Sequence, residues 1–284
     1  MSDITVIGLG KMGLALAKAL LNSGHTVTVW NRSPTKSTEI ASEGAEVARS
    51  VAGAIEASPI VLICINNYST TRDIFETDQV LANIKNRIIV QLSSGTPQEA
   101  VEGNAWFTEN GAHYLDGAIL GSPLIIGTNE GQIIVSGGSE SWEQAKTVLN
   151  CLSGNLNYAG NKIDSAKVLD LAFIVQRLSL FMGVFQGLLL CESAGVSAEI
   201  YESTIASDGR TKLLASTIYK ETFSDPINSI KLWSNALHHL QIQAKQTNTN
   251  TEVLDFIEDK FRRAKAAGIE EEDLAAIIKL LRDN

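Results

Sequence analysis

The chain of 284 residues is 44% hydrophobic and 19% charged, a balance typical of a folded globular protein rather than a disordered one. Its formal net charge of −9 argues against nucleic acid and anionic membrane surfaces as partners, because both require a basic footprint. The three cysteines, Cys64, Cys151 and Cys191, lack metal-ligand spacing and fit reduced thiols. We therefore expect a cytoplasmic protein with no metal site and no secretory signal at the start of the chain.

The first part of the chain alternates short β-branched runs with helical stretches, as βαβ units do. Strands are predicted at Ile4–Gly8, Thr26–Trp30, Ile60–Ile65, Ile88–Leu92, His113–Asp116, Gln132–Ser136 and Leu156–Tyr158. Helical stretches separate the early strands, which predicts a parallel sheet. The closing strands follow one another more closely and allow an antiparallel edge. The pattern predicts an α/β Rossmann domain over residues 1–161.

Strand signals nearly vanish beyond residue 160. A long helix is predicted to begin at a cap formed by Asp164 or Ser165 and to end at Gly195, which favours a helix C-terminus. More helical stretches follow it. Residues 162–284 are therefore predicted to form an all-α domain that begins with a long interdomain helix.

The long helix is apolar over most of its surface between Leu169 and Cys191. Polar residues interrupt it at Asp170, Gln176, Arg177 and Gln186. These interruptions favour a helix buried between protein surfaces over a membrane span. A helix that is apolar nearly all round must be covered on every side, and the rest of the second domain is too small to do so. We therefore expect an intertwined homodimer in which two such helices pack together, and no membrane association.

The segment Gly8–Gly13 reads G-L-G-K-M-G and lies between a predicted strand and a predicted helix, the context that a dinucleotide-binding turn requires. Gly8 permits the tight turn, Gly10 lets a pyrophosphate approach the backbone, and Gly13 lets the helix and strand pack closely. We assign this turn to cofactor binding through Gly8, Leu9, Gly10, Met12 and Gly13. The alternative is a glycine turn at a strand–helix junction that binds no ligand.

The end of the second strand indicates which dinucleotide is bound. Enzymes that use NAD carry an acidic residue there, whereas this chain has Asn31, Arg32 and Ser33, with Lys36 one turn later. Arg32 and Lys36 could pair with the 2′-phosphate of NADPH and Ser33 could donate a hydrogen bond to it. Ser33 and Pro34 also read as the cap and first residue of a second helix. The alternative is that these cations are ordinary solvated charges.

Two later loops follow predicted strands and are expected at the same edge of the sheet. Ile65 and Asn66 follow the third predicted strand, where a loop would border the cofactor. Ser94 and Thr96 follow the fourth, and their hydroxyls could donate hydrogen bonds near the ribose or carboxamide. We assign all four residues to the cofactor site.

Several motifs in one order make the chain similar to the imine reductases, within the wider β-hydroxyacid dehydrogenase superfamily. The similar segments are Gly8–Gly13, Gly24–Ser33, Leu92–Pro97, Tyr114–Ile119, Ala236–His239 and Arg263–Gly268. The resemblance covers essentially the whole chain. It implies NADPH-dependent reduction of a C=N bond, and an active site between the first domain of one subunit and the helical domain of the other.

Two comparisons within the superfamily favour the imine reductase branch. The β-hydroxyacid dehydrogenases typically carry a Ser-Gly-Gly substrate loop after a strand that ends in aspartate, whereas residues 116–122 here read D-G-A-I-L-G-S. They also use a lysine early in the long helix, and Lys167 stands one position away from it. The imine reductases place an aspartate or tyrosine where Asp170 stands. The resemblance therefore implies that Asp170 is catalytic.

Asp170 is also singled out by its neighbours, which are apolar from Leu171 to Val175. A carboxylate in an apolar helix costs several kcal/mol to bury unless it is paired or faces a polar cavity. We interpret it either as a carboxylate that stabilises a cationic iminium or as an acid that protonates the imine nitrogen. The structural alternative is a carboxylate that complements the helix dipole or pairs with Lys167 or Arg177.

The sequence thus predicts an NADPH-dependent oxidoreductase that reduces a small-molecule imine to an amine. One alternative is an NADP-dependent β-hydroxyacid dehydrogenase or carbonyl reductase, in which Lys167 would polarise the substrate oxygen. Another is a non-catalytic NADPH-binding protein. We interpret Lys167 as a solvated lysine near the start of the helix rather than as a catalytic residue.

Overall fold

The computed structural model describes residues 1–33, 35–205, 209–226 and 228–282 and divides the chain into two compact units, Met1–Asp170 and Leu171–Asn284. The division falls within helix α8 (Ser165–Ser193), whereas the predicted boundary after residue 161 precedes this helix. The start of α8 belongs to the first unit because its backbone and side chains form hydrogen bonds with residues of that unit. The Ala166 amide donates to the Ser136 hydroxyl at 3.0 Å, and the buried ammonium group of Lys167 donates to the Ser93 and Gly117 carbonyls.

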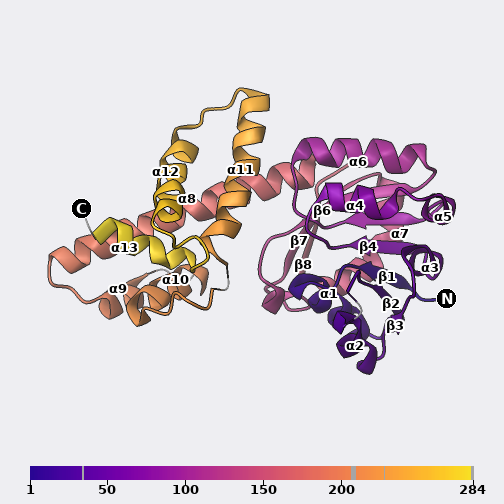
Figure 1. Cartoon of the computed structure of the whole chain (residues 1–284), viewed down its shortest axis with the longest axis horizontal. Helices are drawn as coiled ribbons and strands as arrows, with labels where there is room; N and C mark the ends of the chain where they lie inside the picture. Colours follow the sequence, from indigo (N-terminus) through magenta and orange to yellow (C-terminus); the bar gives the residue numbers. More distant parts are fainter. Residues whose placement is uncertain (34, 206–208, 227, 283–284) are drawn as a thin grey trace. The chain divides into compact units, whose positions relative to one another are not determined.

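The first unit is built on one sheet with the strand order β3-β2-β1-β4-β5-β6-β7-β8 (Figure 1). Its strands are β1 (Ile4–Ile7), β2 (Val27–Trp30), β3 (Glu46–Val47), β4 (Ile60–Ile63), β5 (Ile88–Gln91), β6 (His113–Ile119), β7 (Gln132–Gly137) and β8 (Asn155–Tyr158). All neighbours are parallel except β6 and β7. The predicted Rossmann domain is therefore confirmed, including its antiparallel pairing.

Two strands differ from the prediction. β3 was not predicted, because its two exposed residues are too short a run to show a periodic pattern. β6 runs on to Ile119, beyond the predicted end at Asp116, because its second half pairs with β7. Asp116 consequently lies inside the sheet, opposite Gln91 of β5 and Ser136 of β7, rather than in a loop.

Helices cover both faces of this sheet. They are α1 (Lys11–Asn22), α2 (Thr35–Ser42), α3 (Val51–Glu56), α4 (Tyr68–Phe75), α5 (Asp78–Asn83), α6 (Pro97–Glu109) and α7 (Ser139–Leu149), with short 3₁₀ turns at Pro123–Ile125 and Asn150–Leu152. Alternate residues of a strand point to opposite faces. On β4, Leu62 joins a core cluster with α1 and α7, whereas Ile63 joins another with α3 to α6.

The second unit is helical in its described residues, as predicted. It holds the rest of α8, followed by α9 (Ala198–Thr204), α10 (Gly209–Lys220), α11 (Ile230–Thr247), α12 (Glu252–Ala266), a 3₁₀ turn (Leu274–Ala276) and α13 (Ile277–Arg282). One stripe of α8, which includes Leu178, Phe185 and Leu188, is buried in the core of this unit. Gly195, with φ of +74°, follows the helix as predicted.

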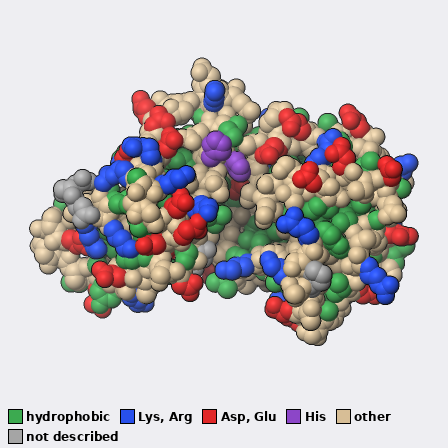
Figure 2. Space-filling model, in the orientation of Figure 1, with side chains coloured by type: hydrophobic (Ala, Val, Ile, Leu, Met, Phe, Trp, Pro, Cys, Tyr) green, Lys and Arg blue, Asp and Glu red, His purple; other side chains and the backbone are tan. Residues whose placement is uncertain are grey.

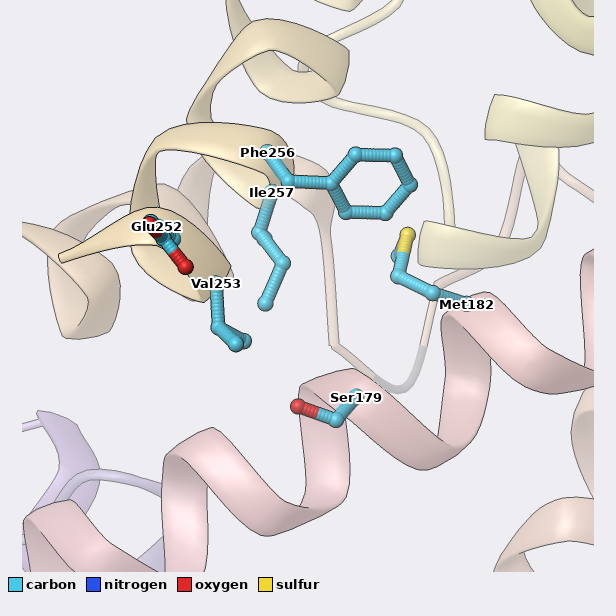
Figure 3. Close-up of a pocket in the computed structure, with 6 residues that line it drawn as sticks. All are labelled: Ser179, Met182, Glu252, Val253, Phe256 and Ile257. Atoms are coloured by element: carbon cyan, nitrogen blue, oxygen red, sulfur yellow. The ribbon is translucent and has the colours of Figure 1, made fainter.

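Another face of α8 is not covered by the residues that the structure describes. By length and composition α8 could cross a membrane, and one stripe of it is buried in the core of the second unit. Leu190 is nevertheless 68% exposed, and Phe256 of α12 is 52% exposed. Figure 3 shows a pocket of about 310 Å³ in this unit, where Phe256 and Ile257 of α12 point toward Met182 and Ser179 of α8. Both helices therefore present apolar surface to solvent.

Candidate functional site

The predicted cofactor residues gather at one edge of the sheet. β1, β2, β4 and β5 are parallel and end in register, with Ile7 paired to Trp30 and Ile63, and Ile63 paired to Gln91. The order reverses between β1 and β4, and ligands of open α/β sheets bind at the carboxyl ends of strands at such a point. The residues that we assigned to the cofactor lie in the loops after these four strands or in the first turns of α1 and α2.

The glycine turn after β1 meets the steric requirements of a dinucleotide-binding loop. Gly8 has a φ of +98°, and a Cβ atom there would lie 2.3 Å from the Cys64 carbonyl oxygen. A Cβ atom on Gly13 would lie 1.9 Å from the Gly8 carbonyl oxygen. Apart from Gly10 itself and its chain neighbours, no heavy atom of the described residues lies within 4 Å of the position of a Cβ atom on Gly10. Gly8 and Gly13 thus hold the turn together, while Gly10 leaves open space at the N-terminus of α1 for a phosphate group.

Asn31 joins the first two loops of this edge. Its side-chain oxygen accepts a hydrogen bond from the Leu9 amide at 3.0 Å, and its side-chain nitrogen donates to the Ser33 carbonyl at 3.0 Å. Arg32 and Lys36 are exposed beside it, and Figure 2 shows Lys and Arg side chains on the surface around α1 and α2. The other half of the predicted Ser33–Pro34 cap, Pro34, lies outside the described residues.

The loops after β4 and β5 support one another. The Ile65 amide donates to the Ser93 hydroxyl at 3.1 Å, while Asn66 and Ser94 are exposed at the edge. Thr96 is different, because it is the N-cap of α6 and its buried hydroxyl donates to the Glu99 carboxylate at 2.9 Å. Thr96 therefore fixes the start of α6, and its side chain is already used where we predicted a bond to the cofactor.

A buried polar cluster next to this edge was missed by the sequence analysis. Asp116 is fully buried, and its Oδ2 accepts hydrogen bonds from the hydroxyls of Tyr68 at 2.6 Å and Tyr114 at 2.8 Å. Its Oδ1 lies 3.5 Å from the ammonium nitrogen of Lys167. The cluster therefore joins α4, β6 and α8. A tyrosine two residues before an aspartate on a buried strand was the available signal, because alternate residues share a face.

The interpretation of Lys167 as a solvated lysine was wrong. Its side chain is 1% exposed, and its Nζ donates to the Ser93 carbonyl at 2.7 Å and to the Gly117 carbonyl at 2.6 Å. Asp116 is the third neighbour, as an ion-pair partner whose Oδ1 lies 3.5 Å from the ammonium nitrogen. Buried charges in proteins are paired in this way because desolvation without partners is costly.

Burial dominates the electrostatics of the cluster. It raises the pKa of the Asp116 carboxyl above its usual range, and this rise is opposed first by the Lys167 charge and then by the tyrosine hydroxyls. Burial, followed by the Asp116 charge, also raises the pKa of Tyr68 and of Tyr114. Both hydroxyls therefore stay protonated and donate to the carboxylate at neutral pH.

Asp170 lies one helical turn after Lys167 on α8 and is partly exposed. Burial raises the pKa of its carboxyl from 3.8 to about 6, while the Lys167 charge lowers this pKa and the Asp116 charge raises it. A carboxyl group that titrates close to neutral pH can hold or release a proton under working conditions, as a general acid or base requires.

The chain is similar to known dinucleotide-binding enzymes. Residues 3–160 match the family described as the NAD binding domain of 6-phosphogluconate dehydrogenase. An NADPH-dependent reductive aminase of Aspergillus oryzae is 31% identical over 191 residues, or 67% of this chain and 64% of that protein. An imine reductase of Myxococcus stipitatus, solved in complex with NADP+, is 31% identical, with a TM-score of 0.69 over 98% of this chain and 99% of that one.

The fold is also that of more distant enzymes. A 3-hydroxyisobutyrate dehydrogenase of Mycobacterium tuberculosis, solved with L-serine, has a TM-score of 0.86 over 99% of both chains, at 19% identity. This likeness concerns the fold alone. Among curated relatives, the chain spans 64%, 42% and 45% of the lengths of three that it matches.

The glycine turn, the sheet topology and these matches define the class of protein, an NADPH-dependent oxidoreductase with a Rossmann domain of the 6-phosphogluconate dehydrogenase type. The predicted cofactor is thereby confirmed. Within this class the chain belongs to the imine reductase family.

Proposed function

We propose that the protein reduces the C=N bond of a small-molecule imine to an amine, with Asp170 as the catalytic residue. The observation that carries this proposal is the Asp170 carboxyl, whose pKa is raised to about 6 at the start of α8. The reductive aminase and imine reductases to which the chain is similar support the substrate class.

The residues at the carboxyl edge fit the cofactor. Gly10 leaves room for the pyrophosphate at the N-terminus of α1, whose first turn carries no acidic residue. Arg32 and Lys36 would bind the 2′-phosphate and thereby favour NADPH over NADH. Ile65, Asn66 and Ser94 would border the nicotinamide half, while Asn31 keeps the first two loops together.

When bound, NADPH supplies a hydride for the carbon of the C=N bond. Asp170 acts on the nitrogen of the same bond. In its protonated form it donates a proton to the imine, and in its ionised form it stabilises the cationic iminium. Because its pKa lies near 6, both forms are populated between about pH 5 and 7.

Lys167 does not favour the alternative of a hydroxyacid dehydrogenase. A lysine that polarises a substrate oxygen must direct a proton toward it, whereas Lys167 donates hydrogen bonds to the Ser93 and Gly117 carbonyls and pairs with the Asp116 carboxyl. We place no substrate contact on this residue.

We also propose that the enzyme is a cytoplasmic homodimer. The support is the uncovered apolar surface of α8 and α12, which includes Leu180, Leu190 and Phe256. A second copy of the chain would bury this surface, as the predicted intertwined dimer requires. A monomeric mass by light scattering at micromolar concentration would contradict it.

The test of function is NADPH oxidation, followed at 340 nm, with a small cyclic imine, alongside NADH and a 3-hydroxyacid with NADP+ as controls. We expect turnover with NADPH and the imine. Asp170→Ala should lower kcat by roughly 10²- to 10⁴-fold, the usual contribution of a general acid, with NADPH affinity nearly unchanged. The matched control is Asp73→Ala, which removes an exposed helical carboxylate. Near-normal turnover by Asp170→Ala would contradict the assignment, and activity only toward the hydroxyacid would contradict the substrate class.

A further inference from the structure

The cluster around Lys167 links the parts of the proposed active site. Through its two carbonyl partners, the ammonium group fixes the backbone of Ser93, next to the exposed Ser94, and of Gly117 on β6. It also anchors the first turn of α8, the helix that carries Asp170 one turn further on. One buried side chain therefore connects the cofactor loop after β5 with the catalytic carboxyl.

The surroundings of the cluster allow little movement. A Cβ atom on Gly95 would lie 2.3 Å from the Tyr68 ring, and one on Gly117 would lie 2.7 Å from the Leu92 side chain. The Tyr68 ring centre lies 5.7 Å from the Lys167 nitrogen. The charge of Lys167 is therefore held in a fixed place rather than averaged over many rotamers.

We propose that Lys167 is a positioning residue, whose buried ammonium group fixes the start of α8 against β6 and the loop after β5 and sets a positive charge one turn before Asp170. This inference rests on the proposed function for its catalytic meaning. The arrangement of charges itself can be tested without any substrate.

The charges around Asp170 give this proposal a distinctive signature. The titratable groups that act in and around the cluster are Lys167 and Asp170 of α8, Tyr114 and Asp116 of β6, Tyr68 of α4, Cys64 after β4 and Glu99 of α6. Of these, Lys167 and then Asp116 act on Asp170 after burial itself, and they act in opposite directions. Removing either charge breaks the same ion pair, yet the pKa of Asp170 should move in opposite senses.

The experiment measures the pKa of Asp170 by NMR titration of its carboxyl carbon, assigned with Asp170→Asn, in protein without substrate. In Lys167→Met the pKa should rise from about 6 to about 7, a shift typical of losing a nearby opposite charge. It should rise even if Asp116 then takes up a proton, because the Lys167 charge has the larger effect on Asp170. In Asp116→Asn the pKa should fall.

Two further variants keep the test decisive. The double variant Lys167→Met/Asp116→Asn removes both charges and so leaves neither of them buried without its partner. It therefore provides a test if the single variants fail to fold, and in it the pKa of Asp170 should still rise. The control is Lys162→Met, which removes a lysine that precedes the same helix and whose side chain is 77% exposed. This variant should leave the pKa of Asp170 unchanged. In each variant, the pH profile of kcat should shift in the same direction as the pKa of Asp170 does in that variant.

A pKa of Asp170 that stays fixed in Lys167→Met and in the double variant would overturn the inference. A shift in the same direction in both single variants would also overturn it, because that result indicates only a loss of structure. A wild-type enzyme that reduces no imine would contradict the proposed function instead, and the NMR titration would still decide the role of Lys167.

Discussion

The carboxyl edge of the sheet and the polar cluster beside it are built on different principles. The edge is open and depends on backbone, since Gly8, Gly10 and Gly13 shape it by having no side chain. The cluster is closed and depends on side chains, since Lys167 and Asp116 are both fully buried. The glycine turn of the edge comes from one strand–turn–helix segment, whereas the cluster is assembled from segments far apart in the chain.

The two regions should therefore respond to different kinds of substitution. In the edge, the harm done by a substitution depends on the space available for one Cβ atom. In the cluster, it depends on whether a buried charge keeps its partner.

The glycine turn should show the largest contrast within one motif. In Gly13→Ala the new Cβ atom would lie 1.9 Å from the Gly8 carbonyl oxygen, so the backbone must move. We expect a loss of about 4 kcal/mol or more in the free energy of unfolding, together with loss of NADPH binding. Gly10 has a φ of −67° and open space around it, so Gly10→Ala should keep its stability within about 0.5 kcal/mol.

Gly10→Ala should nevertheless weaken NADPH binding by roughly tenfold or more, because its methyl group occupies the space of the pyrophosphate. Urea denaturation and a fluorescence titration with NADPH measure the two properties separately. Wild-type stability in Gly13→Ala would remove the steric account of this turn.

The buried pair should come next. Lys167→Met leaves Asp116 without its cation, and losing one partner of a buried ion pair costs about 3–5 kcal/mol of stability. Adding Asp116→Asn should recover a large part of this loss, because no buried charge is then left unpaired. A double-mutant cycle by urea denaturation gives the coupling. Additive losses in the double variant would mean that the two charges do not stabilise one another.

The exposed cations at the edge should affect binding but not folding. Arg32→Ala should raise the KM for NADPH by about 10- to 100-fold and leave the KM for NADH nearly unchanged, because only NADPH carries the 2′-phosphate. The control is Lys85→Ala, an exposed cation that precedes β5 at the other end of the strand. An equal loss with both dinucleotides would argue against a phosphate contact.

The smallest effect should be the pH dependence due to Asp170. Its pKa is raised from 3.8 to about 6 in the folded protein, so the folded state holds the proton more tightly than the unfolded state. Its contribution to stability is complete below about pH 3.8 and is lost as the pH rises to about 6. Asp170→Asn should therefore gain Tm relative to the wild type across this window, by a few degrees. Calorimetry from pH 4 to 7 at constant ionic strength measures the Tm of both proteins. A Tm difference that does not change with pH would contradict the raised pKa.

Much of the first unit could be predicted from local patterns. Strand and helix periodicities located most of the sheet, and the antiparallel pairing followed from the short connections near its end. Only the two-residue β3 and the second half of β6 were missed, since neither carries enough residues with a regular pattern. Asp170 could be singled out because a carboxyl group among apolar neighbours stands out in the sequence itself.

The sequence was sufficient to predict the glycine turn, the absence of an acidic residue after β2 and the choice of Asp170 as the catalytic candidate. Each of these depends on residues within one short segment, where sterics and charge can be judged locally. Only the tertiary structure shows that Lys167 is buried and that Asp116 lies inside the sheet. The physical reason is that a buried charge is tolerated only where partners from distant strands and helices surround it, and no local window contains those partners.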